Sequence, residues 1–125
     1  MSIKSMDLSW IVVSDFKKAI KYYTEVVGLK LHTTSEQHGW AELIGADGGS
    51  VLGIAQHSGY APIPPGHNAI VTFTVDDIVK YKNDISKKGV KFIGDIMEVP
   101  GHVKLLLCED SDGNKFQIVQ VLHKE

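Results

Sequence analysis

The sequence predicts an α+β fold built from two consecutive β-α-β-β-β modules. The main observation is an internal repeat, in which an aspartate and a helical pattern ending in glycine occur at 13–28 and again at 75–89. A strand-like run precedes each copy. Each copy is followed by strand-like segments and a glycine-containing turn, Asp47-Gly48-Gly49 in the first and Ser111-Asp112-Gly113 in the second. A long-period repeat of this kind fixes the architecture before any single residue is considered.

The first module is expected to span about 6–57. Asp15 is a good N-cap for its helix, apolar residues recur behind it at helical spacing, and Gly28 suits the C-terminal end. Runs rich in β-formers, separated by turn residues, predict the strands. These strands are expected at 7–13, 29–36, 40–45 and 50–56.

The second module is expected at about 68–122, after a crossover at 58–67 whose prolines and glycines exclude a regular element. Asp76 lies 13 positions before Gly89 and is expected to cap the second helix, which then runs to Lys88. A ferredoxin-like sandwich is the alternative, but three consecutive strands after each helix favour the module pair. The strands of this module are expected at 69–75, 90–99, 102–109 and 115–121.

Length and composition indicate one globular domain over 1–125. The net charge of −2 gives no reason to expect nucleic acid or a membrane as partner. All 13 basic residues are lysines, so the bidentate fork that arginine offers to phosphate is absent. The single cysteine, Cys108, and the lack of a hydrophobic signal segment predict a cytoplasmic protein.

Several short motifs occur in order along almost the whole chain. They are Val13-Ser14-Asp15-Phe16, Tyr22-Tyr23, Val27-Gly28-Leu29, Val75-Asp76-Asp77 and Asp110-Ser111-Asp112-Gly113-Asn114-Lys115-Phe116. Together they resemble the motifs of the vicinal oxygen chelate family, which includes glyoxalase I, the extradiol dioxygenases and the bleomycin-resistance proteins. The resemblance implies strands curled into a cup with helices on its outer face. In metal-dependent members, His, Gln or Glu from the first and fourth strands of each module hold a divalent ion.

The four ligand positions implied by this resemblance are Leu8, Gly53, Ile70 and Gln117. Only Gln117 has a donor atom, and one neutral oxygen does not hold a catalytic divalent ion. The sequence therefore predicts neither the usual metal site nor a cofactor. A non-standard site is left to the six histidines, each of which is expected on the surface. His57 and His67, at the two ends of the crossover, are the first to consider for such a site.

A cup without a metal ion is a concave and largely apolar cavity, which is the usual form of a small-molecule site. Strand alternation places Trp40 and Glu42 inside, because Ala41 and Leu43 make the better helix-facing surface. The residues expected to bind the ligand are Trp10, Trp40, Glu42, Thr72 and Gln117, with His57 and Tyr60 as further polar groups. Two alternatives stay open: the tryptophans fill a collapsed core, and Glu42 points to solvent at a strand edge.

Two functions are compatible with this lining. The first is a metal-free protein that binds a flat aromatic or polycyclic small molecule, as the bleomycin-resistance members do. Bleomycin itself is disfavoured, because its binders are strongly acidic and this chain is not. The second is a glyoxalase-like lyase, isomerase or dioxygenase with a non-standard metal site or with Glu42 as base. A short chain of this family is expected to complete its cup as a homodimer.

Overall fold

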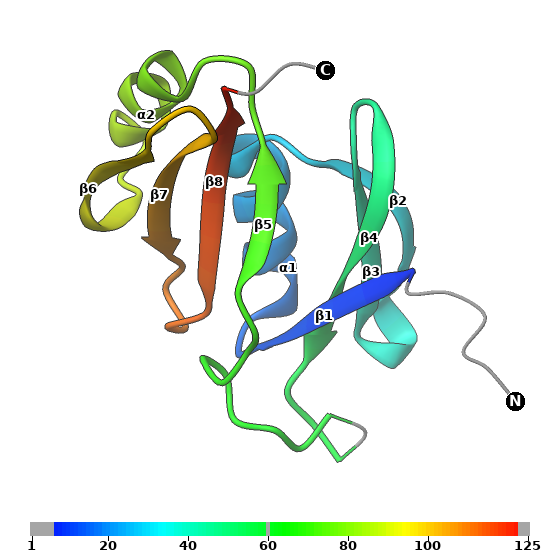
Figure 1. Cartoon of the computed structure of the whole chain (residues 1–125). Coiled ribbons are helices and arrows are strands. Elements are labelled where there is room, and N and C mark those ends of the chain that lie inside the picture. Colours follow the sequence, from blue (N-terminus) through cyan, green and yellow to red (C-terminus); the bar gives the residue numbers. More distant parts are fainter. Residues whose placement is uncertain (1–6, 60, 123–125) are drawn as a thin grey trace, which may run out of the picture. The chain divides into compact units, whose positions relative to one another are not determined.

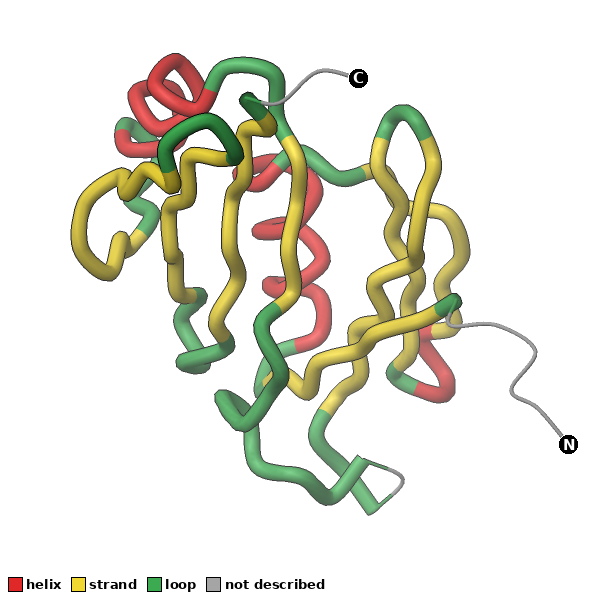
Figure 2. The backbone as a smooth tube through the Cα atoms, viewed as in Figure 1, coloured by secondary structure: helices red, strands yellow, loops and turns green. Residues whose placement is uncertain are grey.

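The computed structural model describes residues 7–59 and 61–122. The chain divides between Asn68 and Ala69 into two compact units. Each unit is a β-α-β-β-β module with a four-stranded mixed sheet (Figures 1 and 2), which confirms the predicted fold class. The first unit contains β1 (Leu8–Val13), α1 (Phe16–Lys21), the π-helix η1 (Tyr22–Val27), β2 (Lys30–Ser35), the 3-10 helix η2 (Glu36–His38), β3 (Trp40–Gly45) and β4 (Gly48–Gln56).

The sheet of the first unit has the order β1-β4-β3-β2, with β1 parallel to β4 and the other pairs antiparallel. One face packs against α1, which contacts β4 and whose Phe16 is buried. Alternation then leaves the opposite face for the candidate site. The buried residues of the covered face are Ile11, Val13, Ala41, Leu43, Leu52 and Ile54.

The start of α1 is fixed by two side chains. Asp15 is the N-cap, and its carboxylate accepts a hydrogen bond of 3.1 Å from the backbone N–H of Lys18. Gln56, at the end of β4, accepts a hydrogen bond of 2.9 Å from the N–H of Phe16 and donates one of 2.8 Å to the carbonyl of Ser14. The helix is therefore tied to the same sheet that carries the candidate site.

The second unit repeats this arrangement. It contains β5 (Val71–Thr74), α2 (Ile78–Ser86), β6 (Lys91–Val99), β7 (Val103–Glu109) and β8 (Lys115–Val121). Its sheet has the order β5-β8-β7-β6, and α2 contacts β7 and β8. Cys108 is fully buried on β7, where burial raises the pKa of its thiol to about 11. No helix in the described part of the chain is long and apolar enough to cross a membrane.

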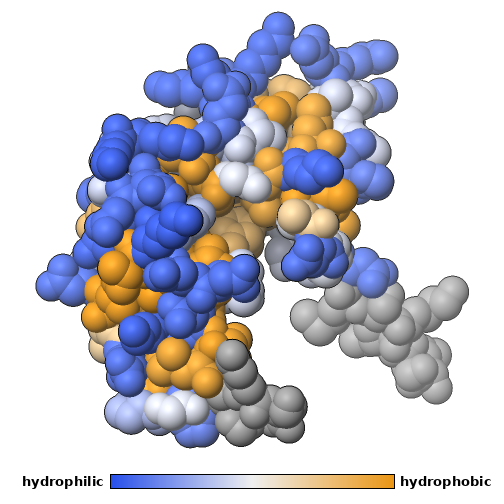
Figure 3. All heavy atoms as spheres, turned by 90° about the horizontal axis from the view of Figure 1, so that it is seen from above, coloured by the Kyte–Doolittle hydropathy of each residue, from blue (hydrophilic) through white to orange (hydrophobic). Residues whose placement is uncertain are grey.

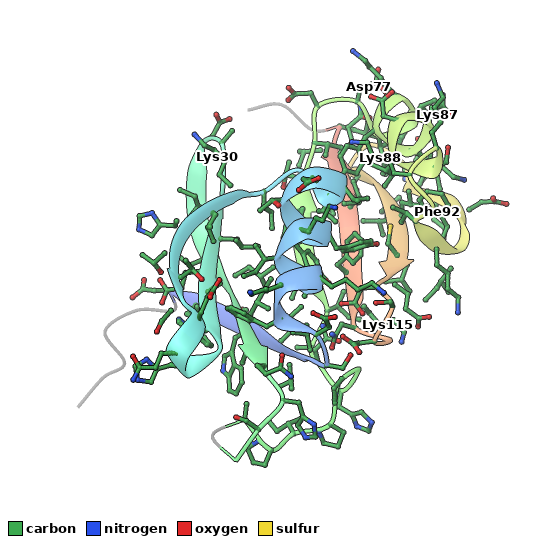
Figure 4. All side chains as sticks on the ribbon, turned by 180° about the vertical axis from the view of Figure 1, so that it is seen from behind. Lys30, Asp77, Lys87, Lys88, Phe92 and Lys115 are labelled. Atoms are coloured by element: carbon green, nitrogen blue, oxygen red, sulfur yellow. The ribbon has the colours of Figure 1, made fainter. Side chains whose placement is uncertain are left out.

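The prediction that Asp76 caps the second helix is wrong. The N-cap is Asp77, labelled in Figure 4, whose carboxylate accepts from the N–H of Lys80 at 3.1 Å. Asp77 lies 12 positions before Gly89, whereas the first helix uses 13 between its N-cap and its terminal glycine. The π-helical turns of η1 take up the additional residue, since a π-helix holds more residues per turn.

The end of β7 carries an ion-pair network centred on Glu109. Lys91 and Lys115, the latter labelled in Figure 4, place their Nζ atoms 2.8 and 2.6 Å from the two carboxylate oxygens. Hydrogen bonds from Lys115 and then Lys91 lower the pKa of Glu109 from about 4.5 to about 2. The carboxylate therefore stays ionised in the folded protein through most of the acid range.

Glu109→Gln is expected to reduce the free energy of unfolding above about pH 4.5, with a difference from wild type that shrinks toward pH 2. The pKa of Glu109 is lower in the folded than in the unfolded protein. Its ion pairs therefore add to the free energy of unfolding above the unfolded pKa, and this contribution is lost on acidification. Urea unfolding across this pH range measures the difference. Asp84→Asn, on the exposed surface of α2, is the control for removing a carboxylate outside this network and should lower the free energy of unfolding by less. A difference that stays constant with pH would contradict the ionic origin.

Candidate functional site

The four positions implied for a metal ion do not form a donor set in either unit. Leu8 and Gly53 lie on β1 and β4 of the first unit, whereas Ile70 precedes β5 and Gln117 lies on β8 of the second. Leu8 and Ile70 have apolar side chains and Gly53 has none, so only Gln117 offers a donor atom. Across residues 7–59 and 61–122, no three His, Cys, Asp or Glu side chains are grouped as a metal ion would need. The residues present therefore do not fit the family's divalent ion.

The histidines of the crossover do not change this result. His57 follows β4 and His67 lies near the end of the first unit, and both are exposed. The backbone N–H of His57 donates 2.8 Å to the carbonyl of Val13, which anchors the start of the crossover. His123 and Tyr60 lie outside the described residues.

Strand register brings three of the expected ligand-binding residues together on the open face of the first sheet. Trp10 on β1 is the neighbour of Gly53 on β4, and Gly53 is the neighbour of Glu42 on β3. The next cross-strand pairs run from Val12 through Ala55 to Trp40. Cross-strand neighbours project from the same face, so Trp10, Trp40 and Glu42 share one surface.

The indole of Trp40 lies directly over Gly53. A Cβ atom at position 53 would lie 2.7 Å from Cζ2 of Trp40 and 2.9 Å from Cβ of Trp10, and it would be closer still to Cη2 of Trp40. Real Cβ atoms do not approach heavy atoms this closely. Any side chain at 53, including a metal ligand, would therefore have to displace the indole. The expected fourth-strand ligand position is filled by an aromatic ring.

The two tryptophans have different surroundings. Trp40 packs against a buried cluster of Val12, Ala55 and Ala61, the last of which comes from the crossover. Trp10 meets Trp40 in an edge-to-face contact, with ring centroids 5.9 Å apart and planes inclined by 64°. It nevertheless remains 42% exposed. Trp40 is thus held by packing, while part of the aromatic surface of Trp10 is exposed.

Glu42 is half-buried on the inner strand β3, so it does not lie at a strand edge. One carboxylate oxygen, Oε2, accepts a hydrogen bond of 3.0 Å from Nε1–H of Trp40. The indole that covers Gly53 therefore also orients the acid. Glu42 and the two tryptophans form a single connected group, which we call the indole–carboxylate face.

Thr72 and Gln117 are cross-strand neighbours on β5 and β8, so they form a separate pair in the second unit. Gln117 also neighbours Leu107 on β7. By register, this row is the counterpart of the row through Trp10, Gly53 and Glu42, but it contains no aromatic or acidic side chain. Among residues 7–59 and 61–122, only the first unit combines an aromatic and an acidic side chain in such a row.

Sequence reasoning missed three residues around the indole–carboxylate face. Thr33 and Ser35 on β2 are the cross-strand neighbours of Glu42 and Trp40, and they add hydroxyl groups beside them. A register shift between Leu31 and Thr33 changes the alternation that would have placed them. Ala61 belongs to an irregular segment, where pairing of its backbone with Ser58 at 3.1–3.2 Å could not be read from periodicity.

Comparisons with known proteins agree with this fold. The model of the Glyoxalase/Bleomycin resistance protein/Dioxygenase superfamily matches residues 5–118. A solved structure of a member of this superfamily from Sphaerobacter thermophilus superimposes with a TM-score of 0.82 at 20% identity, covering 94% of this chain and 98% of that chain. A search of curated proteins found no match.

Two further solved structures are similar over nearly the whole chain. TnmS3, an antibiotic binding protein from Streptomyces sp. CB03234, is 25% identical with a TM-score of 0.79, covering 97% of this chain and 98% of that one. A glyoxalase/bleomycin resistance protein/dioxygenase from Nocardioides is 15% identical with a TM-score of 0.72, covering 100% of this chain and 88% of that one.

Proposed function

The chain belongs to the Glyoxalase/Bleomycin resistance protein/Dioxygenase superfamily, and from this we propose that it binds a flat aromatic small molecule without a metal ion. The observation that carries the proposal is the indole of Trp40 over Gly53, where a family ligand would project. At this position the chain presents aromatic surface and no donor side chain. The expected ligand contacts are Trp10, Trp40 and Glu42.

The geometry of the indole–carboxylate face supports an aromatic ligand. Trp10 is exposed enough for a planar molecule to stack on it, and Trp40 is inclined to it, so the same molecule would meet the second indole near its edge. Both arrangements are favourable for aromatic rings. TnmS3, which is 25% identical, is an antibiotic binding protein, and this supports binding of a comparable kind here.

The test is a titration of tryptophan fluorescence with planar compounds such as acridine, phenazine and naphthoquinone, in buffer with and without a chelator. We expect at least one compound to give a saturable change, with the same Kd in both buffers, because no ion takes part. If every compound leaves the emission unchanged, or if the chelator abolishes the response, the proposal is wrong.

A second candidate function is catalysis with Glu42 as base. It is favoured by the half-buried carboxylate, whose Oε2 is oriented by Trp40. A base must also lie within hydrogen-bond reach of a substrate proton, whereas binding needs only the aromatic surface described above. We therefore place binding first and base catalysis second.

We also propose that the chain forms a homodimer through the open face of the second sheet. Cross-strand register places several exposed apolar side chains on this face, with exposures between 38% and 69%. Apolar side chains also gather on parts of the surface seen in Figure 3. The residues concerned are Ile93, Met97, Val99 and Val121. Sedimentation should give the mass of a dimer, and Met97→Glu should shift it toward the monomer.

We propose the cytoplasm as the compartment, because the buried Cys108 is a free thiol.

A further inference from the structure

We infer that Glu42 selects a ligand that carries a positive charge, so that the molecule is a planar heteroaromatic cation or a protonated aromatic amine. This inference rests on the proposed function and names the chemistry of its ligand. It starts from the position of the carboxylate, which lies half-buried on an inner strand between Gly53 on one side and Thr33 on the other.

The carboxylate of Glu42 has no cationic partner in the described part of the chain. Ion pairs there include those of Glu36, Asp95 and Glu109, and Glu42 belongs to none of these. Its hydrogen bond comes from the neutral N–H of Trp40. Glu109 shows the contrast, since two lysines compensate its charge. A ligand that covered Glu42 without neutralising it would therefore incur a desolvation penalty.

The indole of Trp40 occupies only part of the Glu42 carboxylate, and the rest is available to a ligand. The indole is confined by Gly53 beneath it and by the cluster containing Ala55 and Ala61, so its N–H stays directed at Oε2 of Glu42. An ionised carboxylate has about four acceptor sites on its two oxygens, and the indole uses one. The remaining sites lie on the same face as Trp10.

The aromatic rings favour the same ligand charge. A cation near the face of an indole is attracted by the ring quadrupole, most strongly for tryptophan among the aromatic side chains. Trp10 and Trp40 lie on the same face as Glu42. A flat cation could stack on Trp10 and compensate Glu42 together, whereas a neutral analogue would gain only the stacking.

The experiment compares three probes with the same ring system by calorimetric titration at neutral pH. Acridine is neutral, proflavine is a cation with N–H donors, and N-methylacridinium is a cation without them. Wild type should bind both cations about tenfold more tightly than acridine, equivalent to ~1.4 kcal/mol. Raising the salt concentration should reduce this preference.

Glu42→Gln keeps an acceptor for the N–H of Trp40 and removes the charge. It should lose the preference, so that both cations bind no more tightly than acridine binds to the same variant. Glu36→Gln is the matched control, because Glu36 belongs to the same unit but pairs with Lys17 at 3.9 Å and lies outside the sheet. It should keep the preference.

Each other outcome is decisive. Equal binding of all three probes by wild type would overturn the inference and leave aromatic binding intact. A preference for proflavine alone would show that Glu42 recognises the N–H donors of the ligand and not its charge. This result would also overturn the inference. Loss of all binding in Glu42→Gln would give the residue a structural role instead. If wild type binds none of the three probes, the inference fails, and the titration with phenazine and naphthoquinone described above decides whether aromatic binding fails with it.

Discussion

Replacing Gly53 with alanine is expected to lower the free energy of unfolding by about 1–3 kcal/mol, the usual cost of forcing extra volume into a packed site. The new methyl group would overlap the indole of Trp40, and the ring could move only by disturbing the cluster of Val12, Ala55 and Ala61. Because Gly53 has no positive φ, the cost would come from the close approach and not from the backbone conformation. Urea unfolding followed by circular dichroism measures it.

Gly53→Ala should lower the free energy of unfolding by clearly less when Trp40 is replaced by phenylalanine. Phenylalanine lacks the outer indole carbons Cζ2 and Cη2 that crowd position 53, although Cβ of Trp10, 2.9 Å away, would leave part of the penalty. We expect a coupling of about 0.5–3 kcal/mol between the two positions. Gly59→Ala is the control, since nothing lies near its Cβ position. Equal penalties in both backgrounds would contradict the contact.

Trp10→Ala is expected to weaken binding of an aromatic probe roughly tenfold, ~1.4 kcal/mol, with a smaller effect on stability. The indole is 42% exposed on the edge strand β1, so much of its surface is available to a ligand and less of it stabilises the fold. Comparing the Kd of acridine for wild type and variant gives the loss directly.

Leu31→Ala is the matched control for this experiment. Leu31 belongs to the same unit and is similarly exposed, at 46%. Its cross-strand neighbour is Leu43, which places it on the face opposite Trp10. Binding should be unchanged in this variant. A similar loss in both variants would show that the effect comes from general loosening of the unit.

The fold could be predicted because the repeat carries its own signals. Strand runs, N-cap aspartates and terminal glycines recur in order, and each of them is a local property of the sequence. Equal spacing to the glycine in both modules predicts Asp76 as the cap of the second helix, whereas the cap is Asp77. The π-helical turns at Tyr22–Val27 break that equality, and hydrogen-bond register inside a helix is not visible in apolar periodicity.

The candidate site could be predicted in part. Alternation placed Trp40 and Glu42 opposite the buried Ala41 and Leu43, and the structure agrees. The sequence could not tell that the ring of Trp40 reaches across to Gly53, since this depends on a side-chain rotamer and on the register of β3 and β4. The sequence also predicts Thr72 and Gln117 as ligand-binding residues together with the tryptophans. The two pairs belong to different units. Their shared role in ligand binding stays a prediction.

The indole of Trp40 stands over Gly53, where the family resemblance implies a metal ligand. Elemental analysis tests the proposed absence of a bound metal ion most directly, on protein incubated with Zn²⁺, Ni²⁺, Mn²⁺ or Fe²⁺ and then dialysed. We predict a metal content far below one ion per chain, because Trp40 covers position 53 and three of the four expected ligand positions have no donor. One ion per chain that survives dialysis would contradict the proposal that the chain works without a metal ion.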